Sequence, residues 1–162
     1  MSTNHLRGKA VLVVLALIAA LSLGLAGPAS AAIWYVDNSL AVNGSGTAPD
    51  NAMNNLQDAI TASVANDVIW VTGGTYAEGV ITLDKAITIA GGFNAAFDAR
   101  DIAGNATVID GQNVARATAL VVITAAAKLD GVTVTGGNND ASLAGGNDRG
   151  GGVYIDNVAA VV

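Results

Sequence analysis

The stretch Ile87-Thr88-Ile89-Ala90-Gly91-Gly92 places two β-branched residues one position apart, followed by a small residue and a glycine pair. The same pattern occurs at residues 69–74 and 132–137, and a weaker copy occurs at 107–111. Alternating β-branched residues are typical of short strands, and glycine supplies the positive φ that a following corner needs. We therefore expect the isoleucines of the first stretch to point inward and its threonine to point outward, with the valines and threonine of 132–134 arranged likewise.

Further short runs of β-branched residues lie at 120–123 and 153–155. Most of these predicted strands lie too close together for a helical crossover of about a dozen residues, which argues against an ordinary βαβ sheet. Glycine-punctuated strands about 20 residues apart are typical of a solenoid, in which each coil stacks on the previous one. The sequence therefore predicts an all-β solenoid, and a β-sandwich of short strands is the alternative.

Residues 53–64 depart from this pattern, because their apolar side chains are spaced three, four and four positions apart, as on one face of a helix. These side chains are Met53, Leu56, Ile60 and Val64. Asn51, which follows Pro49-Asp50, is the expected N-cap. We expect this amphipathic helix to cap the first coil at 68–72, beside an opening strand at 33–36.

Residues 1–31 are expected to be a cleavable signal peptide. His5, Arg7 and Lys9 give a positive start, the apolar run 11–25 follows, and the small residues Ala29-Ser30-Ala31 suit cleavage before Ala32. The apolar run holds fifteen residues, fewer than the roughly 20 that a membrane-spanning helix needs. We therefore expect a secreted protein or one displayed at the cell surface, the outer membrane included.

The remaining chain is expected to divide at residue 67. Residues 32–67 would hold the opening strand and capping helix, and residues 68–162 would form the first coils. The chain stops at Val158-Ala159-Ala160-Val161-Val162, directly after a predicted strand and without a predicted cap. A solenoid that ended on bare apolar residues would aggregate, so we expect a longer protein truncated here at its C-terminus.

Composition excludes several classes of function. Loss of Arg7 and Lys9 with the leader would change the formal net charge from −6 to −8, which disfavours nucleic acids and anionic membrane surfaces as partners. The chain has no cysteine, and its one histidine, His5, lies in the predicted leader. A mature chain of this composition cannot form a Ser-His-Asp triad, a Cys-His pair or an ordinary zinc site.

Several segments carry a family resemblance when they are taken together. They are Trp34-Tyr35-Val36-Asp37, Leu56-Gln57-Asp58-Ala59-Ile60, Asp67-Val68-Ile69-Trp70-Val71, Gly74-Thr75-Tyr76, residues 87–93, residues 129–137 and residues 150–154. Residues 33–157 thereby resemble the N-terminal part of bacterial right-handed parallel β-helix surface proteins, which overlap in pattern with pectate-lyase-like and polymorphic outer-membrane proteins. The resemblance implies a three-sided right-handed parallel β-helix, of which the amphipathic helix expected above would be the N-terminal cap, and it bears on fold more than on function.

Four aspartates follow directly on apolar strand residues: Asp84, Asp110, Asp130 and Asp156. Asp110 and Asp130 both precede glycine and lie 20 residues apart, so they could face each other on adjacent coils. Such a pair is a candidate Ca²⁺ site or an acid/base pair for cleaving a glycosidic bond. Asp-Gly is also common turn chemistry, in which the carboxylate accepts hydrogen bonds from local N–H groups, and this interpretation explains all four aspartates.

Other polar segments give weaker signals. Residues 136–152 share glycine and aspartate with calcium-binding nonapeptides but depart from their register at Asn139, so we expect a projecting loop. The cations show no shared register with the aspartates, and we expect Arg100 to lie in a solvated loop with local ion pairs. These cations are Lys85, Lys128, Arg100, Arg116 and Arg149. Ser45 lacks the strand, helix and histidine of a nucleophile elbow.

Trp34, Tyr35 and Trp70 could stack on sugar rings if they were exposed, but we expect them to pack against the capping helix. No catalytic or cofactor-binding set is therefore identified, with Ca²⁺ at Asp110 and Asp130 as the alternative. The favoured hypothesis is a non-catalytic surface module with an adhesin-like, structural or binding role, whose partner is a polysaccharide or another surface protein. The alternative is a lyase or glycosidase acting on an acidic polysaccharide, with catalytic coils beyond Val162 or with Asp110 and Asp130 as its acid and base.

Overall fold

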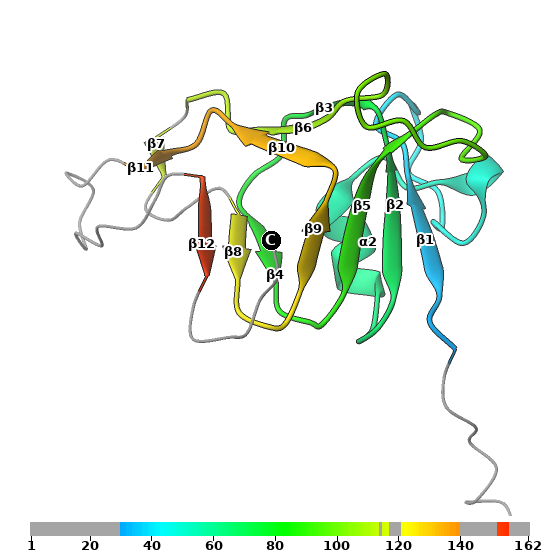
Figure 1. Ribbon diagram of the computed structural model, residues 1–162, viewed down its shortest axis with the longest axis horizontal. Coiled ribbons are helices and arrows are strands. Elements are labelled where there is room, and N and C mark those ends of the chain that lie inside the picture. Colours follow the sequence, from blue (N-terminus) through cyan, green and yellow to red (C-terminus); the bar gives the residue numbers. More distant parts are fainter. Residues whose placement is uncertain (1–29, 114, 117–120, 140–151, 156–162) are drawn as a thin grey trace, which may run out of the picture. The chain divides into compact units, whose positions relative to one another are not determined.

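The computed structural model describes residues 30–113, 115–116, 121–139 and 152–155. Within them, four parallel strands lie side by side in one sheet, here called sheet 1 (Figure 1). In spatial order they are β1 (Ile33–Val36), β2 (Val68–Thr72), β5 (Thr88–Phe93) and β9 (Lys128–Asp130). The strands pair in register, so that equivalent positions are occupied by Trp34, Ile69, Ile89 and Leu129.

The other strands of the described residues form smaller parallel sheets. Sheet 2 has β6 (Thr107–Asp110) between β3 (Gly74–Tyr76) and β10 (Val132–Thr135), and it crosses the upper edge of Figure 1. Sheet 3 has β8 (Val121–Ile123) between β4 (Ile81–Leu83) and β12 (Val153–Ile155). A two-stranded pair joins β7 (Ala115–Arg116) to β11 (Asn138–Asn139).

Buried aliphatic side chains from the three sheets meet in one core. Ile69 and Ile89 of sheet 1, Ile109 of sheet 2 and Ile123 of sheet 3 all have no exposed surface. Strand alternation explains this, because every second side chain of a strand points to the same face of its sheet. Burial of these side chains is the main source of the stability of the fold.

The predicted inward and outward positions are confirmed in two strands. At β5 and the residue before it, Ile87 is 2% exposed and Ile89 is fully buried, whereas Thr88 is partly exposed. In β10 the two valines, 132 and 134, pack against the core, and Thr133 is exposed.

The helix α2 (Leu56–Ala62) is shorter than the predicted span of 53–64. Its N-cap is Asn55, whose side chain accepts a hydrogen bond from the N–H of Asp58 at 2.9 Å. The predicted cap, Asn51, instead ends the 3-10 helix η1 (Pro49–Asn51), and Val64 is 58% exposed. Met53 lies outside the helix because it forms a parallel bridge with Val36 at the edge of β1.

Charged side chains hold both ends of α2. The carboxylate of Glu78 accepts hydrogen bonds from the N–H groups of Leu56 (2.6 Å) and Gln57 (3.1 Å). The ammonium of Lys85 donates to the carbonyl oxygens of Ile60 (2.9 Å) and Thr61 (2.8 Å). An acid at the first turn and a base at the last turn satisfy the unpaired backbone groups and complement the helix dipole.

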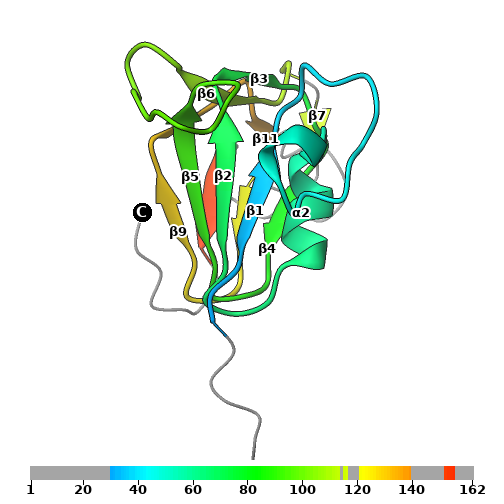
Figure 2. The ribbon, with the colours of Figure 1, turned by 90° about the vertical axis from the view of Figure 1, so that its right-hand side faces the viewer.

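The structure corrects the predicted fold class. Helix α2 buries Leu56, Ala59 and Ile60 in the same core as the strands, and it lies beside β1 and β4 (Figure 2). The described residues are therefore mixed α/β, with small parallel sheets and a helix, and they do not show the predicted all-β right-handed parallel β-helix. Since β1 and β2 pair in parallel and α2 lies between them in the sequence, the chain contains the βαβ connection that the strand spacing argued against.

The spacing of paired strands gives the physical reason for this error. In sheet 1, Ile33 pairs with Val68, Val68 pairs with Thr88, and Thr88 pairs with Lys128, at intervals of 35, 20 and 40 residues. The first interval holds helix α2, and the last holds a long loop after β5 as well as the strands of the other sheets. The constant repeat of about 20 residues is therefore absent from sheet 1.

None of the helices in the described ranges is both long and apolar enough to cross a membrane.

Candidate functional site

A glycine pair, Gly91-Gly92, lies near the end of β5 and shapes the entry to the loop of residues 94–105. The pairing of β2 with β5 shifts register between Trp70 and Thr72, opposite this pair. Gly92 has φ +93°, and a Cβ there would lie 2.9 Å from the Cα of Ile102. The N–H of Gly92 donates to Thr107 Oγ1 at 2.9 Å, and its carbonyl accepts from the N–H of Asp101 at 2.8 Å. A side chain at this position would be strained and would push the loop away.

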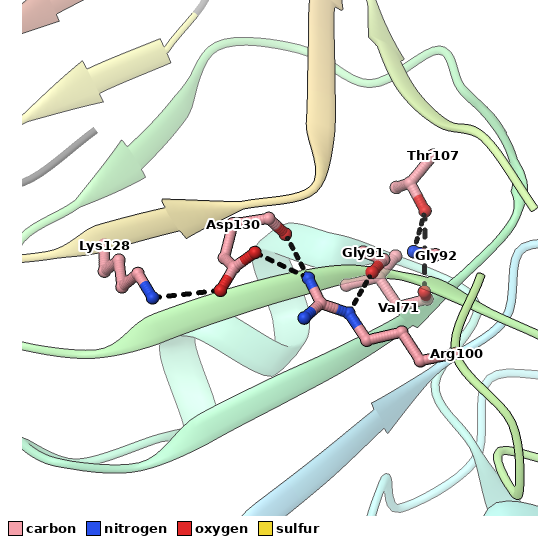
Figure 3. Close-up of polar contacts among 7 residues, drawn as sticks. All are labelled: Val71, Gly91, Gly92, Arg100, Thr107, Lys128 and Asp130. Atoms are coloured by element: carbon pink, nitrogen blue, oxygen red, sulfur yellow. Dashed lines mark hydrogen bonds and ion pairs between the residues drawn. The ribbon is translucent and has the colours of Figure 1, made fainter. Parts of the chain in front are cut away.

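Arg100 ties the loop to sheet 1 (Figure 3). Its Nε donates to the carbonyl of Gly91 at 2.8 Å, and its Nη2 donates to Asp130 Oδ1 at 2.7 Å and to the Asp130 carbonyl at 3.2 Å. Lys128 Nζ lies 2.9 Å from the second carboxylate oxygen of Asp130. The hydrogen bond from Arg100, and then that from Lys128, lower the pKa of Asp130 below its usual value. The predicted local ion pairs of Arg100 are therefore wrong, because its partner lies 30 residues away.

Aromatic side chains fix the loop on the outer face of sheet 1. Phe97 is 4% exposed and meets the ring of Tyr35 edge-on, with centroids 5.1 Å apart. Trp70 stacks on Phe93 at a centroid distance of 4.4 Å. The prediction that Tyr35 and Trp70 pack against the helix is therefore wrong. Trp34 points to the opposite face, where it packs against the core and donates its Nε1–H to Asp67 at 2.9 Å.

A hollow of about 170 Å³ lies where β1, β2 and β5 end. Its walls come from the last residues of β2 and β5, from residues that directly follow β1 and β2, and from the two ends of the loop. The lining residues are Asp37, Ser39, Thr72, Gly73, Phe93, Asn94, Ala95 and Asn105. Two larger hollows of the described residues, about 340 and 410 Å³, contain no buried charged side chain. We therefore take the hollow at the strand ends as the candidate site and call it the strand-end hollow.

Asp37 gives the strand-end hollow its chemical character. It is 6% exposed, and its Oδ1 accepts the N–H of Ser39 at 2.9 Å. Within the described residues, Oδ2 accepts no hydrogen bond, and no lysine or arginine lines the hollow. A buried carboxylate oxygen without a donor is costly, so the site favours a ligand that donates a hydrogen bond.

The opposite wall of the hollow is built by the loop. Asn94 holds the start of the loop, because its side-chain oxygen accepts the N–H groups of Asp98 (3.2 Å) and Ala99 (3.3 Å). Asn105, which also lines the hollow, donates its side-chain N–H to the Gly92 carbonyl at 3.3 Å. The hollow thus offers both hydrogen-bond donors and acceptors, and the loop anchored by Arg100 sets their positions.

The aspartates predicted as metal ligands are not brought together. Asp110 ends β6 in sheet 2, where its Oδ1 accepts the N–H of Gln112 at 2.8 Å, as expected for a turn. Asp130 ends β9 in sheet 1 and carries two cations. Asp84 is exposed just after β4, and Asp156 lies outside the described residues. Since Arg100 and Lys128 repel a metal ion near Asp130, the structure gives no support to a shared Ca²⁺ site, and metal binding at Asp110 stays a prediction.

Ser45 and the glycine-rich segment complete the predicted sites. The Ser45 hydroxyl lies 2.8 Å from Thr47 Oγ1 and accepts the side-chain N–H of Asn51 at 2.9 Å, so it serves a turn. In the glycine-rich segment, β11 occupies residues 138–139, and residues 140–151 lie outside the described ranges. Across the part of the chain that the structure describes, no three Asp, Glu or His side chains gather as a metal site would need.

The chain matches no family profile, no curated protein and no solved structure.

Proposed function

We propose that this chain is an exported, non-catalytic binding module whose strand-end hollow takes a sugar ring of a neutral polysaccharide. The observation that carries the proposal is the buried carboxylate of Asp37, whose Oδ2 accepts no hydrogen bond within the described residues, in a hollow that Ser39 and Asn105 also line. Sugar hydroxyls both donate and accept hydrogen bonds, so they can use the carboxylate and the neutral polar groups together. An ammonium ligand would use only the acceptors.

The size and charge of the hollow support the same ligand class. A cavity of about 150 Å³ accommodates a benzene molecule, so about 170 Å³ limits the ligand to one small group, such as part of one sugar unit. Phe93 lines the hollow beside the polar residues, so the site combines apolar and polar groups, as in most small-molecule sites. Asp37 and the formal net charge of −6 disfavour uronates, because like charges repel.

The charged side chains around the loop support a non-catalytic role. Arg100 and Lys128 are both bound to Asp130, which fixes the loop and engages both oxygens of that carboxylate. An acid/base mechanism for glycosidic cleavage needs two carboxyl groups about 5–9 Å apart on either side of the bond. Asp37 is the carboxylate that lines the strand-end hollow in the described chain.

Binding and cleavage can be measured together. The secreted protein is titrated by calorimetry with a neutral glucan and with polygalacturonate, and the mixtures are then assayed for new reducing ends and unsaturated uronates. We expect binding of the neutral glucan without product. Asp37→Asn should weaken binding by at least about tenfold, since a hydrogen bond to a charged group contributes about 1.5–3 kcal/mol.

Asp84→Asn is the matched control, because it removes an equal charge at an exposed position away from the hollow. The control should bind as the wild type does. Product release from either polysaccharide would contradict the non-catalytic role. Equal binding by the wild type and Asp37→Asn would contradict the assignment of the hollow.

A further inference from the structure

Asp67 is a buried carboxylate whose partners are N–H groups. It is 3% exposed, and its Oδ2 accepts hydrogen bonds from Trp34 Nε1 and from the backbone N–H of Val64, both at 2.9 Å. Its Oδ1 accepts the backbone N–H of Ala32 at 2.8 Å. Both ion pairs found in the described ranges belong to Asp130, so Asp67 has no cationic side chain as a partner there. A buried charge without an opposite charge is costly.

The nitrogen of Ala32 is held in place by sheet 1. The N–H of Val68 donates to the Ala32 carbonyl at 2.9 Å, which extends the pairing of β1 with β2 by one residue. Ala31 and Ala32 are exposed and lie outside any helix or strand, so the peptide bond between them is open to a protease. The small residues Ala29-Ser30-Ala31 directly before this bond suit cleavage by a leader peptidase.

We propose that cleavage between Ala31 and Ala32 creates an α-ammonium group that forms an ion pair with the buried carboxylate of Asp67. Hydrolysis adds one water across the peptide bond: the hydroxyl joins the carbonyl carbon of Ala31 and one hydrogen joins the nitrogen of Ala32. The new carboxyl group then gives its proton to the amine, which leaves a carboxylate on the leader and an ammonium on Ala32. The nitrogen already lies 2.8 Å from Asp67 Oδ1, so the bond that exists as N–H···O becomes charge-assisted without a change of position.

The geometry selects one cleavage position. A chain that began at Ala31 would still present a neutral amide at Ala32. A chain that began at Ile33 would lack the nitrogen that Asp67 binds. Processing before Ala32 therefore supplies the missing positive charge at the end of sheet 1. This inference rests on the export proposed above and is independent of what the strand-end hollow binds.

The test uses the full chain, expressed with its leader in a secreting bacterium. Intact mass and N-terminal sequencing of the secreted product should show Ala32 as its first residue. The product is then treated with cyanate near pH 7, where the α-amine reacts in preference to lysine because it loses its proton at about pH 8 rather than above pH 10. An ammonium paired with a carboxylate keeps its proton more tightly, so it reacts more slowly.

We expect the N-terminus of the native protein to react at least about tenfold more slowly than in the same protein unfolded in guanidinium chloride. A rise of about one unit in the pKa of the α-amine would leave about tenfold less of its reactive, unprotonated form. Burial does not account for such protection, since Ala32 is exposed. Asp67→Asn should remove most of the protection, and Asp84→Asn should keep it. If Asp67→Asn does not fold, the comparison of native and unfolded wild type decides.

A first residue other than Ala32 would overturn the inference. So would a native reaction rate within twofold of the unfolded rate. Neither result affects the binding test at Asp37, because that test compares variants that share one N-terminus.

Discussion

Replacing Arg100 with alanine separates the two ways in which this side chain holds the loop. The ion pair with Asp130 is one third exposed, at 32% and 31%, so its contribution is at most about 1 kcal/mol after solvent screening. The hydrogen bond from Arg100 Nε to the carbonyl of the buried Gly91 is different, because its loss leaves that oxygen unpaired at a cost of about 1–3 kcal/mol. We expect Arg100→Ala to lower the free energy of unfolding by about 2–3 kcal/mol in total.

Two control variants isolate the carbonyl contact. Asp130→Asn removes both ion pairs but keeps the bond to Gly91, and Lys128→Ala removes a pair whose lysine is 50% exposed. Each should cost at most about 1 kcal/mol. The assay is urea unfolding followed by tryptophan fluorescence, which reports on Trp70 where it stacks on Phe93.

Salt provides a second readout. In 1 M NaCl the Debye length falls to about 3 Å, so the effects of Asp130→Asn and Lys128→Ala should shrink, while most of the effect of Arg100→Ala should remain. If Arg100→Ala and Asp130→Asn lie within about 0.5 kcal/mol of each other at low and high salt, the argument from the Gly91 carbonyl is wrong.

Three further predictions concern the core and its ionisable groups. Ile89→Ala should lower the free energy of unfolding by about 2–5 kcal/mol in urea, and Thr88→Ala by less than about 0.5 kcal/mol; similar values for both would contradict the assigned faces of β5. Burial raises the pKa of Tyr76 to about 12, so absorbance titration of the phenols should show a late step that Tyr76→Phe removes. Burial alone would raise the pKa of Asp67, but its three N–H donors outweigh it and hold the pKa below the usual 3.8. Its ionised form therefore stabilises the native state above that pH, and the free energy of unfolding should fall as the pH drops below about 3.8, with a shallower fall in Asp67→Asn.

Local patterns in the sequence predicted individual strands well. The alternation at 33–36, 68–72, 107–110 and 132–135 marks strands that the structure contains at those residues. Strand β9 has three residues and includes Lys128 and Asp130, so it offers too little alternation to be recognised. The expected positive φ is found at Gly92 but not at Gly91, and the glycine pair makes a bulge inside β5 where a corner was expected.

Long-range pairing is what the sequence could not supply. The contact between Arg100 and Asp130 joins residues 30 positions apart. The residues that flank each side chain in the sequence do not indicate which residue it pairs with. In the sequence, Asp37 stands out only as the last residue of Trp34-Tyr35-Val36-Asp37, because its burial depends on the loop 94–105 that covers the strand ends. The predicted fold class is wrong for a related reason. Helix α2 was expected to cap the end of a solenoid, whereas it connects two paired strands and shares their core.

The most direct test of the central claim is a nuclear magnetic resonance titration of the ¹⁵N-labelled protein with a neutral gluco-oligosaccharide. The claim predicts that the backbone amides of Ser39, Gly73 and Asn105, which line the strand-end hollow, shift together along one saturable curve, and that Asp37→Asn moves this curve to at least about tenfold higher oligosaccharide concentration. Shifts confined to residues away from the hollow, or identical shifts in Asp37→Asn, would contradict it.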